Sequence, residues 1–135
     1  MRLFVEDESK SVDVGTGSIW YCIYSTAELK ISSEEKTRIP LALSFLKSGE
    51  CAAVDANETA KQMNLVRDAF ANIPPEEAVF DLHDVNRKAP WYGKISSVVT
   101  SCANLFTTSD GKDLFTEVVG LLSYAARKGL KVSAS

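Results

Sequence analysis

His83 is the only histidine of this 135-residue chain, and it stands between two aspartates, Asp81 and Asp84. An aspartate can orient an imidazole so that the ring acts as a general base toward a serine or cysteine nucleophile. Here Asp81 lies two residues away and Asp84 is adjacent. The sequence therefore shows that carboxylates are near His83 but not that either one reaches its imidazole ring. We favour an exposed loop histidine. The alternative is a small enzyme or ligand-binding domain with a pocket near His83.

Carboxylates offer a second possible chemistry, because pairs of them catalyse glycoside hydrolysis. The candidates are Glu6, Asp7, Glu8, Glu34, Glu35, Glu76 and Glu77. All are expected in loops or at helix starts, where acidic residues serve solubility and the helix dipole. We therefore assign no catalytic residue to this chain.

The turn from Thr107 to Lys112 superficially resembles a phosphate-binding loop. It lacks the multiple glycines of such loops, does not end in Gly-Lys-Ser or Gly-Lys-Thr, and carries Asp110, which would repel phosphate. It also lacks the alternating acidic ligands of a calcium loop. We interpret it as a capped turn and expect no cofactor.

The three cysteines, Cys22, Cys51 and Cys102, are odd in number, widely spaced and set among apolar residues. With one histidine and no Cys-x-x-Cys pair, the chain cannot supply the ligands of an ordinary zinc site. Reduced, buried thiols are the favoured interpretation.

Composition narrows the class of partner. The net charge is -3 and the pI about 5.2, so the basic footprint of a nucleic-acid-binding protein is absent. A mild acidic excess is compatible with a basic protein partner.

No apolar run approaches the roughly 20 residues of a membrane span. Acidic residues follow the short apolar start, unlike a signal peptide. We expect one cytoplasmic domain over 1–135.

Periodicity and capping residues predict the elements that would position any site. Strands are predicted at Arg2–Val5, Ser11–Val14 and 18–24, the last either buried on both faces or the start of a helix toward Leu29. A capping box starts at Ser32. Because Pro40 is awkward inside a helix but tolerated in a first turn, this helix is expected to begin near Arg38 and to end before Gly49. The next is capped by Asp55, shows an apolar face of Ala60, Met63, Val66, Phe70 and Ile73, and stops at Pro74.

The carboxy-terminal half carries the strongest apolar periodicity in the chain. Helical spacing predicts one helix over 95–106, through Ile95, Val98, Val99, Cys102, Leu105 and Phe106, and a second over 115–126. Ser109 or Asp110 is the predicted cap of the second helix, which should end at Gly129 before a strand over 130–132. We predict an α+β fold in which the last strand joins the first ones, packed against about four helices.

This half resembles the immunity protein 70 family, antitoxins of bacterial polymorphic toxin and contact-dependent growth inhibition systems. The resemblance is carried by Trp91 with the helix predicted after it and by residues 104–115, which contain the phrase Thr-Ser-Asp-Gly-Lys-Asp-Leu-Phe. The helix over 117–126 and the closing strand continue it. The helix over 55–75 is a weaker match. The resemblance implies that the motif residues stabilise the fold and do not contact the toxin. These residues are Trp91, Asp110, Gly111, Leu114 and Phe115.

The resemblance implies a stoichiometric inhibitor without chemistry of its own. Its partner would be a cognate toxin domain, the C-terminal domain of a large secreted toxin encoded upstream, and not a nucleic acid or a membrane. Many toxins are basic because they attack nucleic acid, so an acidic surface would steer them. The acidic candidates for toxin binding are Glu6, Asp7, Glu8, Glu76, Glu77, Asp81 and Asp84.

Overall fold

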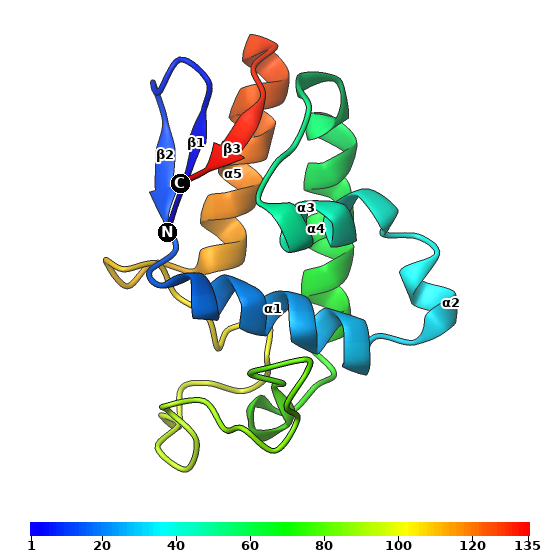
Figure 1. Cartoon of the computed structure of the whole chain (residues 1–135), viewed down its shortest axis with the longest axis vertical. Helices are drawn as coiled ribbons and strands as arrows, with labels where there is room; N and C mark the ends of the chain where they lie inside the picture. The colour runs from blue at the N-terminus through cyan, green and yellow to red at the C-terminus, as the bar shows by residue number, and fades with distance from the viewer.

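A three-stranded antiparallel sheet brings the two ends of the chain together. A computed structural model describes all residues 1–135, with strands β1 (Arg2–Val5), β2 (Ser11–Asp13) and β3 (Val132–Ala134) in the order β2-β1-β3. Leu3 lies opposite Val12 on one side and Ala134 on the other. Figure 1 shows both termini at this sheet. The predicted α+β class and the pairing of the last strand with the first are therefore confirmed.

Five helices accompany the sheet. They are α1 (Gly17–Lys30), α2 (Ser33–Lys36), α3 (Pro40–Ser48), α4 (Ala56–Phe70) and α5 (Leu114–Lys128), with short 3-10 turns η1 (Ala53–Asp55) and η2 (Pro75–Glu77). In Figure 1, α4 and α5 run along the long axis of the molecule and α1 runs across it. The helices α4 and α5 pack on each other, while α3 packs against both α1 and α4.

The predicted strand over 18–24 is wrong, because these residues lie in α1. The alternative reading, a helix running toward Leu29, is the correct one. Residues buried in α1 point in several directions around the helix, so no polar face interrupts the apolar run: Trp20, Cys22, Ile23, Ser25, Thr26 and Ala27. A helix that is buried on most sides shows no regular alternation of apolar and polar residues. Its run of β-branched and aromatic residues then looks like a buried strand in the sequence.

Capping residues located most helix boundaries correctly. The Ser32 hydroxyl accepts a hydrogen bond from the Glu35 backbone N–H at 3.1 Å, as the capping box requires. Pro40 occupies the first turn of α3, and Gly49 ends that helix with φ 75°, a conformation that suits glycine. Asp55 does precede α4, but its side chain makes no capping hydrogen bond because η1 leads directly into the helix.

The cap of α5 is Asp113, so the prediction of Ser109 or Asp110 is wrong. The Asp113 carboxylate accepts from the Thr116 backbone N–H at 2.9 Å. The preceding residues close a turn of their own, in which the Thr108 N–H donates to the Lys112 carbonyl at 2.8 Å. Gly111, at φ 84°, completes that turn. The predicted helix end at Gly129 is confirmed, with φ 68°.

The predicted helix over 95–106 is also wrong, since this stretch is irregular. The Asn104 amide oxygen accepts from the backbone N–H groups of Thr100 and Ser101 at 3.0 and 3.2 Å, and its nitrogen donates to the Val98 carbonyl. Side chains that bond the local backbone compete with helix formation. Cys102 and Phe106 are nevertheless buried, whereas Val98 is 75% exposed.

One hydrophobic cluster connects the sheet, the helices and the irregular stretch. The predicted apolar face of α4 is buried throughout, from Ala60 to Phe70, and Ile73 follows it into the core. All three cysteines are buried and free, as predicted. No helix has the length and apolar character needed to cross a membrane.

Candidate functional site

The chain from Ala78 to Asp113 contains no helix or strand, and we call it the long segment. Most of it forms the loops at the lower end of the molecule in Figure 1, and its last residues rise beside β2 to the start of α5. Loops of such length inside a compact protein usually serve a function. Side chains of α1 hold its first part: the Val79 N–H donates to Thr26 Oγ1 at 2.9 Å and the Leu82 N–H donates to Ser25 Oγ at 3.1 Å. The first part of the segment is therefore held on α1.

Trp91 anchors the middle of the long segment. Its ring packs edge-to-face on Phe80, with centroids 6.0 Å apart, and on Phe106 at 6.3 Å. Phe106 continues to Phe70 of α4, which packs edge-to-face on Phe115 of α5 at 5.5 Å. Such pairs add stability beyond the area that they bury. The aromatic chain joins the long segment to the two longest helices.

His83 lies exposed in the long segment and lines none of the five pockets of the molecule. The Asp81 carboxylate accepts a hydrogen bond from the backbone N–H of His83 at 2.9 Å, and not from its ring. It also pairs with Arg87 at 3.6 Å. The aspartate thus stabilises a local turn, and the imidazole has no partner that would orient it as a base.

The cysteines are poor nucleophiles in this fold. Burial raises the pKa of the Cys22 and Cys102 thiols to about 12 and also raises the pKa of Cys51. Because the thiolate is the reactive form, these thiols are suited to packing. No group of three His, Cys, Asp or Glu side chains is placed to hold a metal ion.

The seven acidic candidates fall into two groups at opposite ends of the long axis (Figure 1). Glu6, Asp7 and Glu8 form the turn between β1 and β2. Two of them are engaged locally, since Glu8 pairs with Arg2 at 2.9 Å and Asp7 accepts from the Ser9 hydroxyl at 2.6 Å. The hydrogen bonds from Ser9 lower the pKa of Asp7.

The second acidic group lies where η2 enters the long segment. Glu77 pairs with Lys30 at 3.6 Å, and Asp81 is held by Arg87. Glu76 and Asp84 are exposed and make no ion pair. Exposed apolar residues lie beside them, because Leu29 and Val85 line one shallow pocket together with Glu76. Apolar and acidic groups are thus mixed at this end.

Comparison with known families decides the class of protein. A family model described as immunity protein 70 matches residues 4–133, nearly the whole chain. The chain belongs to the immunity protein 70 family. No curated protein and no solved structure matches it. Family membership makes this an immunity protein and points to a role in binding a protein partner rather than in catalysis.

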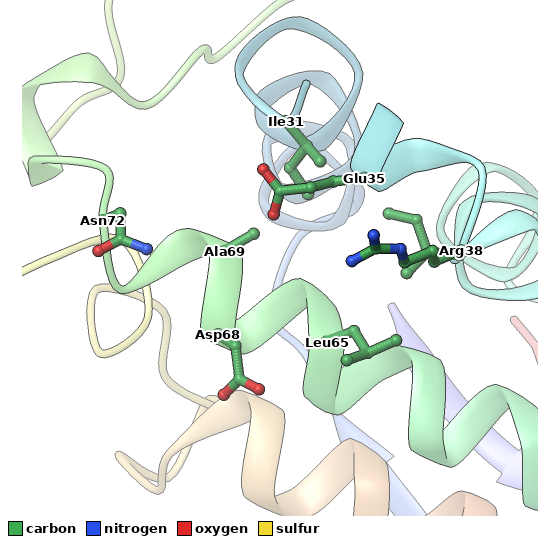
Figure 2. A pocket seen from close by; sticks show the side chains of 8 residues that line it. Ile31, Glu35, Arg38, Leu65, Asp68, Ala69 and Asn72 are labelled. Atoms are coloured by element: carbon green, nitrogen blue, oxygen red, sulfur yellow. The ribbon is translucent and has the colours of Figure 1, made fainter. Parts of the chain in front are cut away.

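The sequence did not single out a recess of this immunity protein that lies between α4, α2 and the end of α1. Figure 2 shows the Glu35 carboxylate and the Arg38 guanidinium directed into the space above Ala69 and Leu65. The recess measures about 190 Å³, and buried Ile31 and Ile39 also line it. Leu65 could have pointed to this recess in the sequence, because it is a large apolar residue of α4 that lies outside the predicted buried face.

Proposed function

We propose that this immunity protein binds and neutralises a cognate toxin domain by stoichiometric protein–protein contact, protecting its cell from contact-dependent growth inhibition. The partner is the C-terminal domain of a large secreted toxin encoded just upstream, met in the cytoplasm. The match to the immunity family over residues 4–133 carries this proposal. The exposed histidine and the buried, high-pKa thiols support a role through binding.

Of the two acidic groups, we favour the one at the long segment as part of the toxin-binding surface. Glu76 and Asp84 there have no cationic partner, and the apolar side chains of Leu29 and Val85 lie exposed nearby. At the β1–β2 turn, Glu8 pairs with Arg2, Asp7 accepts from the Ser9 hydroxyl, and no large apolar side chain lies exposed beside them. Exposed apolar side chains beside charged groups are typical of protein interfaces.

The proposal is tested by co-purifying this chain with the upstream toxin domain, followed by calorimetric titration and a toxin activity assay. We expect one-to-one binding at nanomolar affinity, about -12 kcal/mol, with loss of toxin activity. A His83→Ala variant should still neutralise the toxin, because His83 lines no pocket and the proposal assigns its ring no chemistry. A loss of affinity alone would place His83 in the interface beside Asp81 and Asp84. Absence of binding by the wild-type protein would contradict the proposal.

Charge reversal tests the acidic surface separately. Changing Glu76, Glu77, Asp81 and Asp84 together to lysine should slow association and weaken its salt dependence, because these carboxylates would steer a basic toxin. The same reversal of Glu6, Asp7 and Glu8 is the matched control at the other end of the molecule. Stopped-flow association rates would decide; unchanged rates in the first variant would remove this group from the interface.

A further inference from the structure

The two outer edges of the sheet differ in how they are covered. On the β3 side, Val132 exchanges both backbone hydrogen bonds with Cys51 at 2.9 Å, so that edge is occupied. On the other side, β2 forms the outer margin of the sheet in Figure 1, and no further strand pairs with it. An uncovered edge presents backbone donors and acceptors that another extended chain can bond. The β2 edge is therefore a possible contact for a partner.

The strand register identifies the backbone groups that point out from this edge. The Val14 N–H donates to the Met1 carbonyl, and antiparallel strands alternate between hydrogen-bonded and non-bonded residue pairs. Val12 therefore bonds to Leu3 of β1, whereas the N–H and C=O groups of residues 11 and 13 point away from β1.

A hollow of about 480 Å³ lies beside these outward groups, between β2 and the turn from Thr108 to Lys112. The Asp13 carbonyl accepts a hydrogen bond from the Ser109 N–H at 3.1 Å, so the end of the long segment closes the edge at that point. The Asp13 N–H and both backbone groups of Ser11 have no partner within the chain. Ser11 and Asp13 are also exposed, so these groups can be reached.

The open groups fit a chain in the extended conformation. Such a chain carries unpaired N–H and C=O groups at the spacing of a strand, whereas the backbone of a helix is bonded within itself. Proteins use this mode of recognition by adding a segment of the partner to a sheet edge. The main chain then supplies the hydrogen bonds, and the side chains of the added segment supply specificity.

A second copy of this chain fits the edge poorly. Two-fold pairing of identical antiparallel edges places either Val12 or Ser11 opposite its own counterpart. Pairing at Val12 requires the Asp13 carbonyl, which the Ser109 N–H already occupies. Pairing at Ser11 places Asp13 opposite Ser9, which lies outside the strand in the β1–β2 turn. An extended segment of a different protein has neither conflict.

We propose that an extended segment of the toxin domain adds to β2 as a fourth strand, accepting hydrogen bonds from the Ser11 and Asp13 N–H groups and donating to the Ser11 carbonyl. The inference rests on the proposed function and names the conformation of the partner at one contact. Ser109 places this contact at the end of the long segment, whose start carries the acidic surface proposed above. The pairing uses backbone groups and none of the carboxylates of the β1–β2 turn.

The test compares two substitutions at one position. Ser11→Pro removes the outward N–H, and an edge strand tolerates proline because that N–H has no partner within the chain. Ser11→Val keeps the N–H and suits a strand. Titration with the upstream toxin domain should show affinity weakened about tenfold or more for Ser11→Pro, and nearly wild-type affinity for Ser11→Val. Wild-type affinity of a folded Ser11→Pro variant, or an equal loss in both variants, would overturn strand addition.

Amide hydrogen exchange, measured by NMR on the wild-type protein, tests the same bonds without a substitution. The Ser11 and Asp13 N–H groups should exchange rapidly in the free protein and about tenfold or more slowly in the complex. The Val12 N–H, which faces β1, should be protected in both states and is the internal control.

The outcomes separate this inference from the proposed function. A complex that forms without slowing exchange at Ser11 and Asp13 would overturn strand addition while the proposed function stands. Slowed exchange at high concentration of this chain alone would identify a second copy as the occupant and would also overturn it. Failure of the wild type to bind would overturn the proposed function itself.

Discussion

The helical framework and the long segment satisfy their polar groups in different ways. In α4 and α5 the backbone groups bond to one another, and buried apolar side chains pack between the helices, with Arg67 bonding Thr116 and Asp113 at one end. In the long segment, the backbone forms only isolated turns, such as Thr108 to Lys112, and other backbone N–H groups donate to side chains of Ser25 and Thr26 in α1 and of Asn104. Backbone ladders tolerate many sequences, whereas each side-chain bond depends on one residue. The framework should therefore carry most of the stability, and the long segment should be easier to perturb locally.

The largest expected effect tests the framework. Phe115→Ala should lower the free energy of unfolding by about 3–5 kcal/mol, because the ring is buried against Phe70. Trp91→Ala, in the long segment, should cost about 2 kcal/mol, since that ring is only partly buried. Urea unfolding measures both values. A larger loss for Trp91→Ala than for Phe115→Ala would reverse the comparison.

A smaller effect locates the boundary between the two regions. Asp113→Ala should cost about 1–2 kcal/mol, because the carboxylate caps α5 and also pairs with Arg67 at 3.0 Å. Ser109→Ala should change stability by less than about 0.5 kcal/mol, since its side chain caps no helix. Thermal unfolding of the two variants measures both losses of stability and shows which residue caps α5. Equal losses would mean that the helix begins earlier than Asp113.

The smallest effect involves no substitution. Iodoacetamide labelling of the native protein at about pH 8 should be slow, because all three thiols are buried and their raised pKa values keep them protonated. Local opening of the long segment should let Cys102 react before Cys22 and Cys51. Mass spectrometry of the labelled peptides gives the order. Simultaneous labelling of all three would show that the two regions open together.

The sequence predicted the regions where a local signal and the tertiary environment agree. Pro40 and Gly49 mark helix ends through their own backbone preferences, so α3 was predicted closely. The capping box at Ser32 was also predicted, but not that it starts a short helix of its own, α2. The face of α4 was predicted because one side is buried and the other is polar. These signals lie within a few residues of the structure that they determine.

The errors lie where contacts distant in sequence decide. The helix α1 is covered on several sides, which removes the period that would identify it. The stretch over 95–106 has helical spacing, yet Asn104 and its neighbours bond the local backbone, and Cys102 is held by a hydrogen bond from its N–H to the Ile73 carbonyl. The recess at Glu35 and Leu65 was missed for the same reason, because it joins helices that the chain order separates.

The order of strands in the sheet has a consequence during synthesis. β1 is the central strand, and it pairs residues 3–5 with residues 132–134 of β3. Until residue 134 has left the ribosome, one edge of β1 has no partner, although β2 can already form the hairpin on the other side. Pairings so distant in sequence form late and slowly. A nascent chain that lacks β3 therefore exposes an open strand edge that other chains can join.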